Sequence, residues 1–168
     1  MVDMNTFLTT LYVMVDDFCK SRYPIEVKPG RSPSLTRSEV VTLSLMGQWY
    51  RFRSQRDFYR FAVRNLRTAF PTLPTQPQYN RLVRRHHDAI IAFFLNLVET
   101  MEARQVPYEI LDTTGVPVRN NNRRGSGWLI DANRGQCTRL GWYYGFRLLI
   151  STTPQGIITG FGFGPGSA

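Results

Sequence analysis

Lysine, cysteine and long apolar runs are all scarce in this chain of 168 residues. Two cysteines, Cys19 and Cys137, are too few and too far apart in sequence for a disulfide framework, and they fit a reducing cytosol. The longest apolar run covers residues 89–95, far fewer than the roughly 20 residues that cross a bilayer. The N-terminal segment contains acidic residues and no basic leader, so it does not resemble a signal peptide. We therefore expect a cytoplasmic protein without a membrane segment.

Acidic residues are outnumbered by basic ones, 12 to 21, which gives a net charge of +9 and an isoelectric point near 10.2. Lys20 and Lys28 are the only lysines, so 19 of the 21 basic residues are arginine. A basic protein favours a polyanionic partner, and arginine binds phosphate oxygens in a fork and stacks on bases. A GC-rich genome would also favour arginine codons. Composition alone leaves both explanations open.

The first 105 residues have the pattern of helices. Apolar residues at helical spacing predict a first helix, followed by a linker rich in proline and glycine over residues 24–33. A capping box formed by Thr36 and Glu39 predicts a second helix to about Tyr50. Ser54 predicts the start of a third helix, with Asp57 in its first turn. A start at residues 75–78, with proline in the first turn, predicts one long helix to near residue 104.

After Pro107 the pattern changes to strands. The segment of residues 108–118, "YEILDTTGVPV", has apolar neighbours on both sides of Asp112 and predicts a buried strand. The polar stretch of residues 119–127 predicts a mobile loop. Residues 143–152 and 157–163 are two further predicted strands, and the turn of residues 153–156 joins them as a hairpin.

Five arginines fall within a narrow sector of the predicted helix that follows Ser54, at about 100° per residue. They are Arg53, Arg56, Arg60, Arg64 and Arg67. Asp57 is the only acid between residues 51 and 85, and the helix lies where a helix-turn-helix places its second helix. Arg81, Arg84 and Arg85 follow on the next predicted helix. We interpret all eight as candidate DNA-binding residues, and a solvated helix face is the structural alternative.

Other polar and aromatic residues give weaker indications. His86 and His87 are adjacent, so their side chains diverge on a helix and a surface or capping role is favoured over a metal site. The aromatic residues 142–144 are typical of a sheet core more often than of a platform for base stacking. Asp131 and Cys137 remain ambiguous.

Asp112 is the residue whose role is hardest to explain from the strand alone. A carboxylate on a buried strand costs several kcal/mol unless a cation, a metal ion or hydrogen bonds compensate for the lost water. Hydrogen bonds from the backbone near Thr113 and Gly115 would make it a turn-forming residue. A metal-ligand role is equally compatible with the residues themselves.

Three segments together cover most of residues 35–168: "LTRSEVVTLSLMGQWYRFRSQRDFYRF", "ILDTTGVPV" and "YYGFRLLISTTPQGIITGFGFGPGSA". They resemble the DDE transposases of bacterial insertion sequences, whose catalytic domain is ribonuclease-H-like. The resemblance implies an α+β fold: a helical, helix-turn-helix-like DNA-binding region in residues 1–105, then a truncated three-stranded antiparallel meander in residues 106–168. It also implies an open sheet edge beside the strand of Asp112, where the family's fourth strand would pair.

By this resemblance Asp112 is the first of three acidic residues, and thus both a catalytic residue and a metal ligand. Three carboxylates hold two divalent cations, roughly 3.5–4 Å apart, at the scissile phosphate. Mg²⁺ is the expected ion, with Mn²⁺ as a substitute, in a completed active site only. The sequence ends at Ala168, before the positions of the second and third acids.

The resemblance implies DNA transposition in the bacterial cytoplasm, associated with the nucleoid. Relatives cleave DNA at element ends and transfer the 3′-hydroxyl to target DNA, whereas this chain alone is expected to bind DNA without cutting it. The expected partners are DNA and a second polypeptide or another transposase copy. The alternatives are a non-catalytic DNA-binding regulator or inhibitor of transposition, and a decayed remnant that barely folds.

Overall fold

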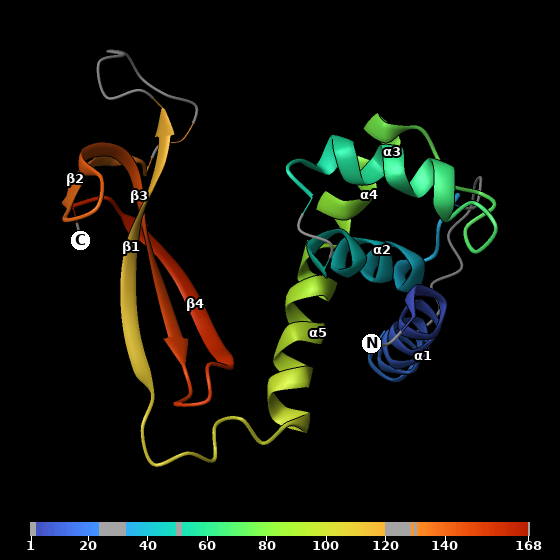
Figure 1. The fold of residues 1–168 in the computed structure, drawn as a ribbon, viewed down its shortest axis with the longest axis horizontal. Coiled ribbons are helices and arrows are strands. Elements are labelled where there is room, and N and C mark those ends of the chain that lie inside the picture. Colours follow the sequence, from blue (N-terminus) through green and yellow to red (C-terminus); the bar gives the residue numbers. More distant parts are fainter. Residues whose placement is uncertain (1–2, 24–32, 50–51, 120–128, 130, 168) are drawn as a thin grey trace. The chain divides into compact units, whose positions relative to one another are not determined.

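The computed structural model describes residues 3–23, 33–49, 52–119, 129 and 131–167. Within these residues five helices precede a four-stranded sheet, so the fold is α+β (Figure 1). The helices are α1 (Met4–Arg22), α2 (Arg37–Trp49), α3 (Gln55–Asn65), α4 (Gln76–Arg85) and α5 (His87–Thr100). The strands are β1 (Ile110–Arg119), β2 (Asn133–Cys137), β3 (Gly141–Thr152) and β4 (Ile158–Pro165). The chain divides into two compact units, Met1–Phe94 and Leu95–Ala168.

The helices α2, α3 and α4 begin where the local sequence predicts. The backbone N–H of Thr36 donates to Glu39 Oε2 at 2.6 Å, and the N–H of Glu39 donates to Thr36 Oγ1 at 3.2 Å. These two bonds confirm the capping box at the start of α2. Ser54 Oγ accepts from the N–H of Asp57 at 3.1 Å and caps α3. Pro77 lies in the first turn of α4, where its missing N–H leaves no bond unmade.

The long helix expected from residue 75 to near residue 104 is two helices, so that prediction is wrong. Its first half ends at Arg85, and His86 leaves the helical conformation with φ −105° and ψ 17°. The N–H of His86 still bonds the carbonyl of Leu82 at 3.0 Å, while the carbonyl of His86 accepts from Ala89 N–H at 3.1 Å. His86 therefore closes α4 and opens α5, and neither glycine nor proline marks the break in the sequence.

One apolar core holds α1 to α4 of the first unit together. Its buried residues come from these helices and the connections between them: Leu8, Leu35, Val40, Leu43, Met46, Phe58, Ala62, Leu66, Phe70, Leu73 and Tyr79. A second contact joins α1 to the middle of α5, where the rings of Phe18 and Phe93 meet edge to face with centroids 5.4 Å apart. Burial of these side chains fixes which helix faces remain exposed to solvent.

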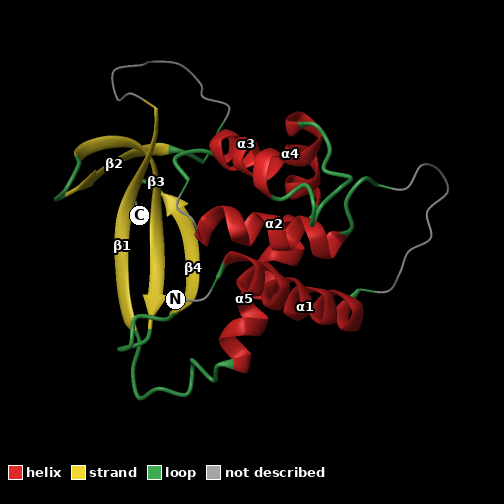
Figure 2. Cartoon of the chain, turned by 45° about the vertical axis from the view of Figure 1, so that its right-hand side comes forward, coloured by secondary structure: helices red, strands yellow, loops and turns green. Residues whose placement is uncertain are grey.

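The second unit contains the antiparallel sheet, coloured yellow in Figure 2. β3 is its central strand: β1 pairs along one side of β3, while β2 and β4 pair with successive parts of the other side. The expected antiparallel pairing of β1 with β3 and of β3 with β4 is confirmed. The hairpin turn is also confirmed, because Gly156 N–H bonds the carbonyl of Thr153 at 2.9 Å and Gly156 has a positive φ of 84°.

The strand β2 was not expected. Its sequence, "NRGQC", lacks the alternation of apolar and polar residues that predicts a strand. Pairing with β3 from Asn133 opposite Gly145 to Cys137 opposite Gly141 defines it instead. The expected loop of residues 119–127 begins with the last residue of β1, and its remainder lies outside the described residues.

β1 is an edge strand and is not buried, which corrects the expectation for the segment around Asp112. Asp112 is exposed, and Ile110 and Leu111 are 50% and 67% exposed. The reason lies in the pairing: within the described residues β1 pairs with β3 alone, so it lies at the edge of the sheet, where fewer neighbouring side chains cover its own. Among all the residues that the structure describes, no helix is both long and apolar enough to cross a bilayer.

Candidate nucleic-acid interface

The amphipathic helix α3 carries the arginines predicted from sequence spacing. Phe58 and Ala62 are buried in the core of the first unit, which fixes the inner face of the helix. Arg56, Arg60 and Arg64 are exposed on the opposite face. Because arginine side chains are long and the inner face is held by packing, these three guanidinium groups can reach a ligand without any change in the helix.

Arg53 and Arg67 extend this row beyond both ends of α3. Arg53 precedes Ser54, the residue that caps the start of α3. Arg67 follows Leu66, the residue that caps its end. Both arginines are exposed. All five arginines are exposed, but helical spacing places only Arg56, Arg60 and Arg64 on one side, because Arg53 and Arg67 lie outside α3.

The helix α4 presents a second group of exposed arginines. Arg81, Arg84 and Arg85 are exposed, whereas Tyr79 on the other side of α4 is buried in the core. Burial raises the pKa of Tyr79 to about 12, an effect that a hydrogen bond with the Ser44 side chain partly offsets. The hydroxyl therefore stays protonated at neutral pH and anchors α4 as a neutral group.

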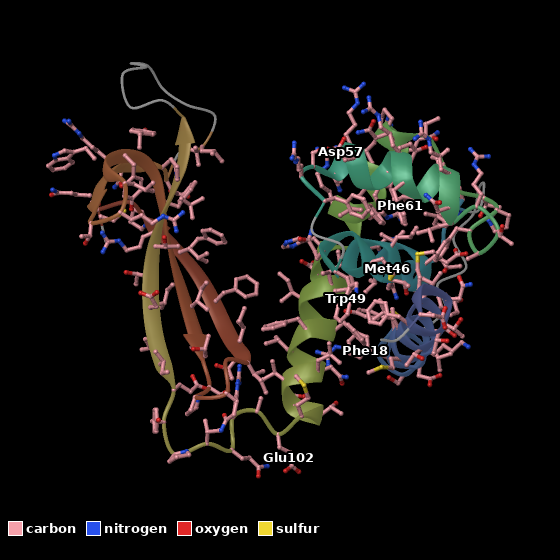
Figure 3. All side chains as sticks on the ribbon, viewed as in Figure 1. Phe18, Met46, Trp49, Asp57, Phe61 and Glu102 are labelled. Carbon is pink, nitrogen blue, oxygen red and sulfur yellow. The ribbon has the colours of Figure 1, made fainter. Side chains whose placement is uncertain are left out.

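Packing fixes α3 and α4 relative to each other. The Tyr59 hydroxyl donates to the carbonyl oxygen of Pro74 at 2.6 Å and ties α3 to the segment before α4. The ring centroid of Tyr79 lies 6.1 Å from that of Tyr59 and 6.4 Å from that of Phe58. Figure 3 labels Asp57 and Phe61 on α3 and shows nitrogen-tipped side chains projecting from the outer side of the helix. The two groups of arginines belong to one packed body.

We define the arginine face by the eight exposed residues of these helices and their ends: Arg53, Arg56, Arg60, Arg64, Arg67, Arg81, Arg84 and Arg85. Asp57 reduces its positive charge only slightly. Arg60 Nη1 lies 3.8 Å from Asp57 Oδ1, and both side chains are well exposed. A surface pair of this kind contributes about 0–1 kcal/mol, so Arg60 remains able to exchange this contact for a phosphate.

Asp112 has a local partner. Its Oδ1 accepts a hydrogen bond from the backbone N–H of Thr113 at 2.7 Å, which is the local bonding expected of a turn-forming aspartate. Since the side chain is exposed, the carboxylate keeps most of its water and needs no metal ion to balance the cost of burial.

The donor set around Asp112 does not fit a two-metal centre. Such a centre needs several carboxylate oxygens that converge on two ions. Among the described residues, no three His, Cys, Asp or Glu side chains come together as a group that could hold a metal ion. One exposed carboxylate, with one oxygen engaged by an amide, is too few ligands for Mg²⁺.

No model of a known protein family matches the chain, and no curated protein or solved structure gives a match. The resemblance to DDE transposases therefore rests on the residues of the chain itself. The structural features that bear on it are the arginine face, the antiparallel β1–β3–β4 pairing and the position of Asp112 on β1.

The two adjacent histidines lie where α4 meets α5. His86 caps α4 and His87 is the first residue of α5, which agrees with the capping role favoured for this pair over a metal site. Sequence reasoning did not single out Arg134, whose guanidinium carbon lies 4.9 Å from the ring centroid of Trp142. The only signal in the sequence was a basic residue near an aromatic cluster, because the β2–β3 pairing that joins them was not predictable.

Proposed function

We propose that the chain binds duplex DNA through the arginine face and acts in DNA transposition. The observation that carries the proposal is the burial of one side of α3 and α4 in a common core while eight arginines remain exposed on the outside. The two packed helices hold the backbone of six of these arginines in place. Their exposed guanidinium groups can bind the phosphates of a duplex and release its counterions.

The sheet supports the transposase part of the proposal. Antiparallel pairing of β1 with β3 and of β3 with β4 is the pairing that a ribonuclease-H-like meander requires. Asp112 lies on β1, where the resemblance places the first acidic residue. Cleavage would need further carboxylates beside it, so we assign DNA binding to the chain and no step of cleavage.

A non-catalytic regulator of transposition is the second candidate. The surroundings of Asp112 favour it, because the carboxylate is exposed and bonded to its neighbouring amide. A chain that occupies element ends, or that pairs with a complete transposase, would need the arginine face but no metal centre. The two candidates share DNA binding and differ in whether Asp112 contributes to catalysis.

The experiment that tests the proposal is a salt titration of duplex binding. The full chain is titrated into a fluorescein-labelled duplex and anisotropy is measured at several salt concentrations. We expect the logarithm of the association constant to fall linearly with the logarithm of salt concentration, with a slope of about −0.9 for each phosphate neutralised. Absence of binding at low salt would refute the proposal for both candidates.

A further inference from the structure

A row of aromatic side chains lies on one face of the sheet in the second unit. Successive residues of a strand point to opposite faces, and residues paired across antiparallel strands share a face. We call this surface the aromatic face and define it by Trp142, Tyr144 and Phe146 of β3 with Phe161 and Phe163 of β4. The rings of Phe146 and Phe163 meet edge to face, with centroids 6.4 Å apart, which confirms that the two strands present them together.

The two ends of the aromatic face remain open to solvent. At one end Trp142 is 56% exposed, and toward the other end Phe163 and Phe161 are 62% and 50% exposed. Large aromatic side chains with this exposure on neighbouring strands indicate a binding surface more strongly than scattered apolar residues do. About six residues of β3 separate Trp142 from Leu148, the partner of Phe163, which is roughly 20 Å at 3.3 Å per residue.

Arginine accompanies the aromatic rings at the Trp142 end. Arg134 of β2 lies on the same face, opposite Tyr144, and its guanidinium carbon is 4.9 Å from the Trp142 ring centroid. Arg139 is exposed in the turn that joins β2 to β3. An indole with one ring face near a guanidinium group places a stacking surface and a phosphate-binding cation side by side.

The charge of this part of the chain indicates the kind of partner. Six arginines follow Asp112 in the sequence, and Asp131 is the only acid among the same residues. Of these six, Arg134 lies on the aromatic face and Arg139 in the adjoining turn, whereas Asp112 shares this face only at the Phe161 end, away from Trp142. A surface that served only to bind another protein through apolar contacts would gain nothing from this excess. Positive charge beside exposed aromatic rings is complementary to a nucleic acid whose bases are free to stack.

We propose that the aromatic face is a second nucleic-acid-binding site, specific for single strands. Bases stack on Trp142 and Phe163, and Arg134 with Arg139 binds the intervening phosphates. A duplex hides the faces of its bases, so this surface selects unpaired nucleotides, whereas the arginine face reads the backbone of a duplex. The site accepts DNA or RNA, because stacking and phosphate contacts do not involve the 2′-hydroxyl.

The test uses the full chain with fluorescein-labelled oligo(dT), oligo(U) and a duplex of equal length. We expect Trp142→Ala to weaken oligo(dT) and oligo(U) binding by about tenfold, from the usual size of base–aromatic stacking, and to leave duplex binding unchanged. Trp49→Ala is the matched control, since Trp49 is also exposed but stacks on Phe7 of α1 with centroids 4.4 Å apart. Unchanged binding by Trp142→Ala would overturn the proposal.

A second measurement does not depend on how well Trp142→Ala folds. Trp142→Phe keeps an aromatic ring, so we expect it to bind oligo(dT) within about twofold of the parent. Stacking on the indole quenches its fluorescence, so the quenching that oligo(dT) causes in the parent should be largely lost in this variant. Full quenching without Trp142 would show that bases stack elsewhere and would overturn the proposal.

Two further experiments distinguish this site from single-strand binding by the arginine face and from a protein interface. Arg60→Ala with Arg64→Ala should weaken duplex binding and leave oligo(dT) binding intact. An equal loss of both would assign single-strand binding to the arginine face and overturn the proposal.

Sedimentation tests whether a second copy of the chain occupies the aromatic face. Self-association that Trp142→Ala abolishes, with oligo(dT) affinity unchanged, would show a protein interface instead.

Discussion

Gly115 of β1 lies against the ring of Tyr143, so closely that a Cβ added at Gly115 would be 2.7 Å from Tyr143 Cε1. The same ring approaches Gly135 of β2, where an added Cβ would be 2.8 Å from Cζ. Tyr143 is buried, and its hydroxyl donates to the carbonyl oxygen of Gly166 at 3.3 Å. One tyrosine over two glycines therefore joins three strands on the face opposite the aromatic face.

Gly115→Ala should destabilise the sheet, because the Tyr143 ring has to move away from the new methyl group. Overpacking of this kind costs about 1–3 kcal/mol in free energy of unfolding. Gly162→Ala on β4 is the matched control, since nothing lies within 4 Å of a Cβ there. Urea unfolding followed by circular dichroism measures both variants. Equal midpoints for the two variants would contradict the packing argument.

Arg60→Ala combined with Arg64→Ala should weaken duplex binding and make its logarithmic salt slope shallower by about two, one unit for each lost phosphate contact. Both residues are exposed at the centre of the arginine face. Lys20→Ala with Arg22→Ala removes the same charge from the last turn of α1 and serves as the control. Anisotropy titrations give the slopes. If the two double variants have the same slope, the arginine face is a solvated helix face.

The helix starts could be predicted because their causes are local. Thr36 with Glu39, and Ser54 with Asp57, satisfy backbone donors three residues away, and these bonds need no other part of the fold. The outward position of Arg56, Arg60 and Arg64 was predictable for the same reason, since helical spacing alone places them on one side of α3. The break at His86 has no such local signature.

The sheet was less predictable because its strands depend on distant partners. β2 is a strand only because Gln136 and its neighbours pair with β3 around Trp142. The exposure of Asp112 likewise depends on β1 being an edge strand, which the apolar residues beside Asp112 do not reveal. Arg134 approaches Trp142 through this same pairing, so the aromatic face became visible only in the structure.

The stability of the first unit should depend on pH through His86. Burial, followed by repulsion from Arg37 and Arg85, lowers the pKa of His86 below its ordinary value of 6.5. The unfolded chain then binds more protons than the folded chain between the two pKa values. The contribution of neutral His86 to stability is therefore fully present above pH 6.5 and is lost as the pH falls through that value toward the folded pKa.

His86→Gln should remove this part of the pH dependence, because glutamine does not titrate. The free energy of unfolding is measured from urea titrations between roughly pH 5 and 8, the range in which histidine changes charge. His87→Gln is the control, since His87 is the exposed neighbour at the start of α5. A parent protein that is equally stable throughout this range would refute the effect.

Asp112→Asn distinguishes the transposase from the regulator. Asp112 is exposed, and an asparagine oxygen can accept the Thr113 N–H as well, so the free energy of unfolding should change by less than about 0.5 kcal/mol. Duplex affinity should also be unchanged, because the arginine face is intact.

We expect the chain alone with Mg²⁺ to leave a supercoiled plasmid uncut. When a second polypeptide supplies the other carboxylates, nicking should appear with the parent and with Asp131→Asn, and it should be absent with Asp112→Asn. Nicking that survives Asp112→Asn would leave this residue only its bond to Thr113, and persistent binding without any nicking by the mixture would favour the regulator.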